Sequence, residues 1–203
     1  MLAAANPGVP DIRIETGPEA ARVVALARAK PDAGPGVVWK GPDGGLCFSV
    51  AEVGDFWIPD GHTIAITRNS AADGQTLALY TMGSALGLAL VLQDCLVLHC
   101  ASLAVNGSAT LLLGDSGAGK STLAQQLSMN GFGALGDDTC ALWNANDQSA
   151  PVAYPSGTAF KLWRNSLDAA GIDAAGKQSV GERLDKYFVA EAHAADDRPH
   201  PVN

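Results

Sequence analysis

The chain has 203 residues, of which 47% are hydrophobic and 17% charged, and this balance predicts a globular protein rather than a disordered one. The length allows one substantial domain with a smaller region beside it. The net charge of −8 at pH 7 argues against a nucleic-acid partner, because there is no excess of basic side chains to neutralise phosphates.

Two further features predict a cytoplasmic protein. The four cysteines form no CxxC pair and no metal-ligand spacing, so we expect free thiols in a reducing compartment. Residues 1–14 have neither the basic segment nor the long apolar run of a secretion signal.

Residues 1–74 are expected to form a β-rich N-terminal region. One helix is expected over residues 18–30, because Pro18 suits the first turn of a helix and an apolar stripe follows it. The expected strands, separated by Pro-Asp-Gly turns at residues 42–44 and 59–61, span residues 11–15, 37–40, 46–50, 56–58 and 63–67.

Residues 74–93 carry no charge at all. A membrane span needs about 20 mainly apolar residues. Here the apolar run is interrupted by small and polar side chains, namely Gln75, Thr76, Thr81, Gly83, Ser84 and Gly87. We therefore expect a buried core helix over about residues 75–92 and no membrane partner, with a membrane span as the alternative.

Residues 114–122 match the pattern GxxxxGK[ST] of a phosphate-binding P-loop, and we call them the glycine-rich loop. They are Gly114, Asp115, Ser116, Gly117, Ala118, Gly119, Lys120, Ser121 and Thr122. An apolar strand-like run precedes the loop, and a helix-like segment over residues 121–129 follows it. Small residues let the backbone N–H groups point at phosphate oxygens, Lys120 can reach the β- and γ-phosphates, and Ser121 can hold Mg²⁺. The loop therefore predicts a bound ATP or GTP, and a chance match in a glycine-rich turn is the alternative.

The strand before the loop is expected to have an antiparallel partner. Asn106-Gly107 between the apolar runs 96–105 and 108–113 favours a hairpin with a two-residue turn. That turn pairs residues whose numbers sum to 213, so it would place His99 opposite Gly114, beside the phosphate site. A histidine packed in the core is the alternative for His99.

Asp137 and Asp138 follow a short apolar strand expected over residues 133–136. A carboxylate at the end of a strand beside a phosphate-binding loop commonly serves Mg²⁺, and an adjacent one can accept a proton from an attacking hydroxyl. A solvated turn is the alternative. Beyond this pair we expect a strand at 139–143, a loop at 151–156, a helix at 160–170, mixed structure at 180–189 and a tail at 194–203 without a core signal.

Taken together, the segment 98–138 resembles the catalytic domain of HPr kinase/phosphorylase, most closely the stand-alone HPr-kinase-like serine kinases of bacteria, including those of lasso-peptide gene clusters. The likeness is carried by a histidine fifteen positions before the first loop glycine and by the Asp pair after the loop, and it extends over roughly residues 75–190. It implies an α/β fold: a P-loop nucleotide-binding domain over residues 75–203, with the mixed sheet shared with phosphoenolpyruvate carboxykinase, beside the smaller β-rich region 1–74.

The resemblance also implies an ATP-dependent kinase that phosphorylates a serine of a peptide or small protein, possible acceptors including a lasso precursor. Asp137 would be the catalytic base, His99 would pair with it, and Lys120 would hold the β- and γ-phosphates. Ser121 and Asp138 would serve Mg²⁺. Kinases of this family assemble as oligomers, so a homo-oligomer is expected.

Two departures from the family pattern limit this reading. The downstream signature that HPr kinases use to grip HPr and to run phosphorolysis is absent, which argues against both. The chain stops at residue 203, where further strands and a C-terminal helix are expected, so either the family's end is lost or the chain is cut short. A nucleotide-binding regulatory module without transferase activity, an HPr(Ser) kinase proper and a small-molecule kinase therefore stay open. The cations Lys161, Arg164, Arg183 and Lys186 are either substrate contacts or ordinary surface charges.

Overall fold

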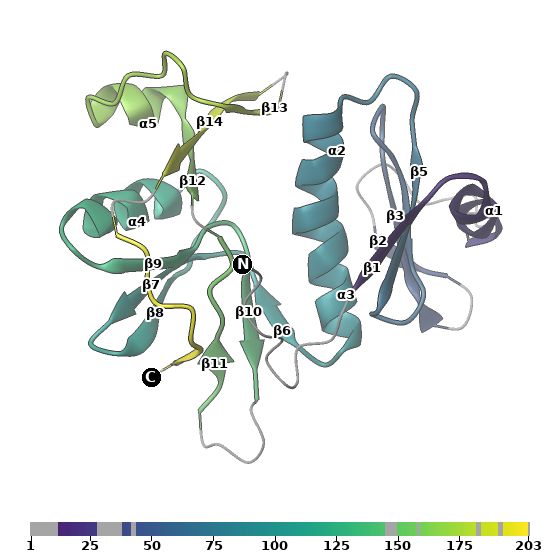
Figure 1. The fold of residues 1–203 in the computed structure, drawn as a ribbon, viewed down its shortest axis with the longest axis horizontal. Helices are drawn as coiled ribbons and strands as arrows, with labels where there is room; N and C mark the ends of the chain where they lie inside the picture. Colours follow the sequence, from purple (N-terminus) through teal and green to yellow (C-terminus); the bar gives the residue numbers. More distant parts are fainter. Residues whose placement is uncertain are drawn as a thin grey trace.

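The computed structural model describes residues 12–27, 38–41, 44–144, 150–157, 159–181, 184–190 and 193–202. Within these residues the protein is a mixed α/β structure with four sheets, one of them a five-stranded mixed sheet. A long helix stands between this sheet on one side and three smaller sheets on the other (Figure 1).

The N-terminal part builds the five-stranded sheet, in the order β1-β5-β4-β3-β2. β1 is parallel to β5, and every other neighbouring pair is antiparallel. Its elements are β1 (Arg13–Thr16), α1 (Pro18–Ala27), β2 (Val38–Lys40), β3 (Leu46–Val50), β4 (Gly54–Ile58) and β5 (Thr63–Arg68).

The predictions for this part are largely confirmed. The helix begins at Pro18, although the predicted residues 28–30 lie outside the described part of the chain, as do Asp11, Val37 and most of the turn at 42–44. The turn at 59–61 forms because the Asp60 carboxylate accepts hydrogen bonds from the N–H groups of His62 and Thr63, at 2.9 and 3.0 Å. Gly61 supplies the left-handed backbone, with φ of 78°.

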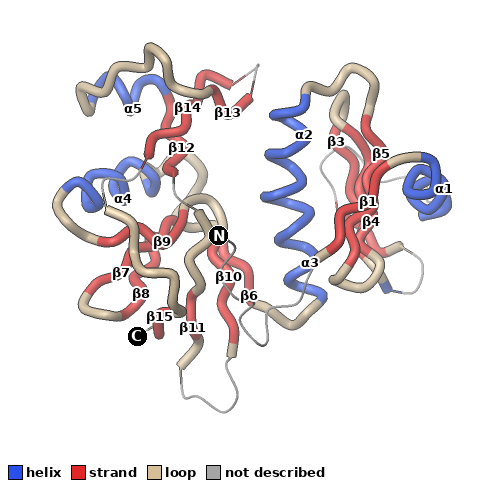
Figure 2. The backbone as a smooth tube through the Cα atoms, viewed as in Figure 1, coloured by secondary structure: helices blue, strands red, loops and turns tan. Residues whose placement is uncertain are grey.

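Residues 74–92 form one continuous helix, made of α2 (Gly74–Tyr80), the π-helical turn η2 (Thr81–Ala85) and α3 (Leu86–Leu92). Asp73 caps its N-terminus by accepting a hydrogen bond of 2.7 Å from Thr76 N–H. Ala85 and Ala89 pack against the five-stranded sheet. Figure 2 shows the helix along one face of this sheet and α1 on the other.

The prediction of a buried core helix is only half right. The helix is long and apolar enough to cross a membrane by length and composition, and 22% of its most apolar window is buried. Ala85 is packed on the sheet, whereas Met82, three residues before it, is 59% exposed. The absence of a membrane partner stays a prediction. Because the helix shares its core with the preceding strands, the division at residues 74 and 75 also stays a prediction.

The rest of the chain forms three small sheets: β8-β7-β9, β15-β11-β10-β6 and β12-β14-β13. Their strands pair antiparallel, and two isolated parallel bridges, Ala109–Val202 and Ala134–Ala194, tie in the C-terminal segment. The elements are β6 (Leu96–Leu98), β7 (Ala101–Val105), β8 (Ser108–Leu112), α4 (Lys120–Met129), β9 (Gly133–Gly136), β10 (Cys140–Trp143), β11 (Val152–Ala153), β12 (Ala159–Trp163), α5 (Arg164–Ala169), β13 (Ser179–Gly181), β14 (Leu184–Ala190) and β15 (His200–Pro201).

The hairpin before the glycine-rich loop has the predicted register, with Val105 paired to Ser108 and Ala101 to Leu112. The single strand expected over residues 96–105 is wrong, because the chain changes sheets at residues 99–100. β6 pairs with β10, whereas β7 pairs with β8 and β9. The four cysteines are buried free thiols, as expected.

Three predictions near the C-terminus are corrected. The expected loop at 151–156 contains β11, and the tail adds β15 beside it, where His200 is buried. The expected helix at 160–170 begins as strand β12 and becomes helical only at Arg164. In β12 the buried Phe160 and Leu162 alternate with less buried neighbours, which is the period of a strand. A short apolar run of this kind fits either structure in sequence.

Candidate functional site

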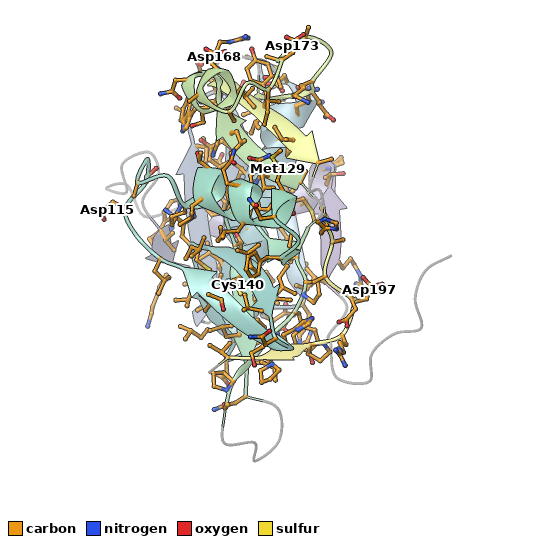
Figure 3. The ribbon with its side chains drawn as sticks, turned by 90° about the vertical axis from the view of Figure 1, so that its left-hand side faces the viewer. Asp115, Met129, Cys140, Asp168, Asp173 and Asp197 are labelled. Carbon is orange, nitrogen blue, oxygen red and sulfur yellow. The ribbon has the colours of Figure 1, made fainter. Side chains whose placement is uncertain are left out.

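The glycine-rich loop connects β8 to α4 and is held open by backbone geometry. Gly117 and Gly119 have φ of 84° and 89°, a left-handed conformation that glycine adopts without strain. Ala118 N–H donates to the Asp115 carbonyl at 3.1 Å, which closes a turn inside the loop. Asp115 projects outward from the loop (Figure 3), and Ser116 is exposed.

The N-terminus of α4 opens onto this loop. Gly119 occupies its N-cap position, and no side chain there caps the first backbone N–H groups. Such a helix end offers N–H donors and a partial positive charge to an anion. The Lys120 ammonium group lies across the loop and donates to the Gly114 and Asp115 carbonyls at 2.8 and 2.9 Å. The backbone N–H groups of the helix end and the ammonium group of Lys120 are therefore both placed where they can bind phosphate oxygens.

The central contact of the site joins the loop to the Asp pair. Ser121 Oγ donates to Asp137 Oδ1 at 2.7 Å, and the backbone N–H of Lys161 donates to Asp137 Oδ2 at 2.8 Å. Burial raises the pKa of Asp137 above its ordinary value, the Lys161 N–H bond opposes this, and the neighbouring Asp138 charge adds to it. Asp137 is thus a partly buried carboxylate with no cation in direct hydrogen-bonding contact among the described residues.

Asp138 lies in a different environment from its neighbour. Its backbone has φ of 69°, and its two carboxylate oxygens face the ammonium groups of Lys161 at 2.8 Å and Lys186 at 3.8 Å. Burial alone would raise the pKa of Asp138, but the Lys161 hydrogen bond and the charges of both lysines outweigh burial and lower it. The two adjacent carboxylates therefore have pKa values shifted in opposite directions.

The expected partner of His99 is wrong. Nδ1 of His99 lies 2.7 Å from the backbone carbonyl oxygen of Asp138, and no bond to the Asp137 carboxylate is present among the described contacts. The cause is the change of sheets: Leu98 pairs with Cys140 across β6 and β10, which sets the next residue, His99, beside the Asp138 turn. His99 also lies beyond the last hairpin pair, Ala101–Leu112, so the expected pairing with Gly114 does not form.

The oxygen donors near the loop fit Mg²⁺. Ser121 Oγ and Asp137 Oδ1 are two hard oxygen ligands side by side. Mg²⁺ in nucleotide sites takes only one or two such protein oxygens and completes its shell with waters and phosphates. The described residues contain no group of three or more His, Cys, Asp or Glu side chains placed to hold a metal. Asp138 stays a predicted metal ligand, and in the structure both its oxygens face lysines.

The sequence left four cations as either substrate contacts or surface charges, and the structure places only some of them near the Asp pair. Lys161 and Lys186 reach the Asp pair, and Lys186 also lies 5.8 Å from the ring centre of Trp163. Arg164 is paired elsewhere, with Asp185 at 3.0 Å and over the ring of Tyr187. Arg183 lies outside the described residues. The sequence did not single out Lys161 among the four cations, because the segment that forms its strand β12 was predicted to be a helix.

Two pockets meet at the Asp pair, and both are lined by Leu79 and Gly83 of the long helix. One has a volume of about 460 Å³ and includes Asp137 and Lys161, and the other, of about 560 Å³, includes His99, Asp138 and Lys161. Sequence reasoning missed the contribution of the helix to both. Its one signal was the run of uncharged residues from 74 to 93, which was interpreted as core.

Thr122, the last residue of the loop motif, faces a third region. Its Oγ1 donates to the Ser166 hydroxyl on α5 at 3.2 Å, and a pocket of about 480 Å³ lies between Gly117 and the residues around Trp163.

Comparison of the chain with protein-family models, with curated protein sequences and with solved structures returns no match.

Proposed function

We propose that this protein is a Mg-ATP-dependent serine kinase that transfers the γ-phosphoryl group to a serine hydroxyl of a peptide or small protein. The observation that carries the proposal is the 2.7 Å hydrogen bond between Ser121 Oγ and Asp137 Oδ1. It joins the hydroxyl of a phosphate-binding loop to a carboxylate that lines an open pocket. A kinase needs both elements at one point, because the phosphoryl group passes directly from nucleotide to acceptor.

The likeness of residues 98–138 to HPr-kinase-like serine kinases supports the same proposal, and with it a P-loop domain of the HPr kinase and phosphoenolpyruvate carboxykinase type. The antiparallel hairpin that leads into the loop is consistent with it. We place the protein in the cytoplasm, in keeping with its free cysteine thiols.

The nucleotide phosphates would lie against the loop backbone and the N-terminus of α4, where N–H groups have no side-chain cap. Lys120 would exchange its two loop carbonyl contacts for the β- and γ-phosphates. Ser121, at the start of α4, would hold Mg²⁺ together with waters and phosphate oxygens, and Mg²⁺ when bound neutralises the charge that develops on the phosphate oxygens.

Asp137 would accept the proton of the acceptor hydroxyl. Its partial burial and raised pKa make it a better base than a solvated carboxylate, because a catalytic base works best with a pKa nearer the working pH. Asp138 would instead fix Lys161 and Lys186 beside the transferred group, since its charge holds both ammonium groups. Lys161 would then stabilise negative charge in the transition state.

The test is phosphoryl transfer itself. The protein is incubated with Mg²⁺ and [γ-³²P]ATP and with a degenerate peptide library that has one fixed serine, and label on the peptide serine is measured. We expect labelled phosphoserine that requires Mg²⁺ and is lost in Lys120→Ala. Nucleotide binding without label on any peptide would overturn the kinase proposal and leave a nucleotide-binding regulatory module.

A further inference from the structure

The 460 Å³ pocket that contains Asp137 lies between the long helix and the C-terminal sheet β12-β14-β13. Figure 1 shows α2 on one side of this space and the strands β13 and β14 on the other. Its volume falls in the range of pockets that bind small ligands or a few side chains.

The helix wall of this pocket is a continuous apolar stripe. Ala78, Met82, Leu86 and Leu90 all line the pocket and recur every four residues, so they lie along one side of the helix. In a regular α-helix such a row drifts around the axis, and the wider π-helical turn η2, which includes Met82, reduces this drift before Leu86. We call these four residues the Met82 stripe.

The Met82 stripe is not the face that packs on the five-stranded sheet. That sheet is contacted by Ala85 and Ala89. A helix with one face on a core normally presents charged residues on the other, but residues 74–93 contain none, and Met82 is 59% exposed. Val180 and Phe188 add apolar side chains to the opposite wall, beside polar ones such as Gln178. An exposed apolar surface of this kind marks a binding site.

The charged groups that line the pocket lie where it meets the Asp pair, and its other polar lining residues, among them Gln75 and Gln178, are uncharged. Asp137 and Lys161 line it there, and Lys161 is already paired with Asp138. The remaining wall offers no free cation for an acidic peptide among the described lining residues. The pocket is therefore suited to a molecule with a hydroxyl at one end and an apolar group next to it.

We propose that this pocket is the acceptor subsite, and that the acceptor is a peptide whose serine has a large apolar side chain within two residues of it. The apolar side chain lies against the Met82 stripe while the serine hydroxyl meets the Asp137 carboxylate. This inference rests on the proposed kinase function.

In the proposed transfer each bond that forms at this site is matched by one that breaks. The serine O–H bond breaks and its proton passes to an Asp137 carboxylate oxygen, while the hydroxyl oxygen forms the new bond to the γ-phosphorus of ATP. The bond from that phosphorus to the β–γ bridging oxygen breaks, and its electron pair leaves on ADP.

The test uses octapeptides with one central serine and each amino acid type in turn at the two positions on either side. We expect Leu, Met or Phe at one of these positions to raise kcat/KM about ten-fold or more over Asp or Lys, as expected for an apolar side chain in an apolar pocket. Met82→Glu should raise the peptide KM about ten-fold and remove the preference, with the KM for ATP unchanged, whereas Met82→Leu should keep both.

Met129→Glu is the matched control. This methionine is 54% exposed, close to the 59% of Met82, but it lies on α4. Figure 3 shows it on the side of the molecule that faces away from the long helix. We expect no change in peptide KM. If Met82→Glu proves unstable, Met82→Gln gives the same comparison without a charge, and a several-fold rise in peptide KM is expected.

The outcomes separate this inference from the proposed function. Transfer to serine regardless of its neighbours, with peptide KM unchanged in Met82→Glu, would overturn the acceptor subsite and leave the kinase standing. Binding of Mg-ATP without transfer to any peptide would overturn the kinase. An equal loss in Met82→Glu and Met129→Glu would show a general effect of added charge and would also overturn the subsite.

Discussion

Replacing Asp137 with asparagine should abolish transfer and at the same time stabilise the fold. The substitution keeps size and hydrogen bonds. The new amide oxygen can accept from the Lys161 N–H, and the amide NH₂ can donate to Ser121 Oγ, because a hydroxyl can turn to accept. What is lost is the negative charge and the capacity to take a proton.

The expected loss of activity is that of a general base. Such residues contribute about 10²- to 10⁴-fold to the rate, or about 3–5 kcal/mol of transition-state stabilisation. The affinity for ATP should change little, since the loop backbone, Lys120 and Ser121 stay in place. In the wild type, activity should fall on the acid side with a midpoint above the ordinary carboxyl pKa, because Asp137 must be ionised to act.

The expected gain in stability follows from the direction of the pKa shift. The pKa of Asp137 is raised by burial, so the folded state binds a proton more tightly than the unfolded state does. The stabilisation that this provides is complete below the unfolded pKa and is lost as pH rises through the folded pKa. At neutral pH the ionised Asp137 is therefore a cost that Asp137→Asn removes, and the two proteins should converge in stability at acid pH.

Asp138→Asn is the matched contrast, one residue away. The pKa of Asp138 is lowered by its lysines, so its charge adds stability above the unfolded pKa, and this is lost as pH falls through the folded pKa. Asparagine tolerates the backbone φ of 69°. Losing the charged hydrogen bond to Lys161 should cost about 1.5–3 kcal/mol, or roughly 3–12 °C in a chain of this size.

The assay is thermal unfolding of the two variants at pH 7 and at a series of lower values, with peptide phosphorylation measured on the same samples. Asp137→Asn should melt above the wild type and Asp138→Asn below it. Full activity in Asp137→Asn would refute its role as the base. A lower melting temperature in Asp137→Asn at pH 7 would refute the argument that its charge is held at a cost.

Three further predictions concern the nucleotide, the sheet and the thiols. Lys120→Ala should weaken ATP binding and turnover together by about ten-fold or more, measured by titration with a fluorescent ATP analogue and by the transfer assay, and unchanged binding would contradict the phosphate role. Gly54→Ala should cost about 1–3 kcal/mol in denaturant unfolding, because its Cβ would lie 2.4 Å from the Thr67 carbonyl oxygen, and a neutral effect would mean that β4 and β5 separate easily. The folded protein should react slowly with a thiol reagent at pH 8, since all four thiols are buried and burial raises the pKa of Cys47 and of Cys95 to about 11, whereas the unfolded chain should titrate four thiols.

Much of the fold could be predicted from local sequence patterns. The Asn106-Gly107 turn gave the hairpin register, and the loop glycines with the following helix gave the position of α4. The extent of the long helix could also be predicted. Which of its faces is covered depends on how the five-stranded sheet packs against it, and the local sequence pattern does not contain that information. The strand β12 was missed for a related reason, since its alternation spans only five residues.

A division of roles between Asp137 and Asp138 was predicted, but the opposite shifts of their pKa values could not be predicted from sequence. Asp137 and Asp138 are chemically identical, and what separates them is the left-handed backbone at Asp138 and the arrival of Lys161 and Lys186 from β12 and β14. His99 reaches the same turn from β6. Residues on or next to three strands far apart in the chain thus surround two neighbouring side chains.

The long helix belongs to the core of the five-stranded sheet and also lines the pocket beside Asp137. Its Ala85 and Ala89 face is fixed by the core of the five-stranded sheet, and the neighbouring Met82 stripe forms a wall of the pocket beside Asp137. Loosening that core would shift the pocket wall while leaving the loop and the Asp pair on their own sheets. On the proposed function, destabilising the five-stranded sheet should therefore raise the peptide KM in the transfer assay before it raises the KM for ATP.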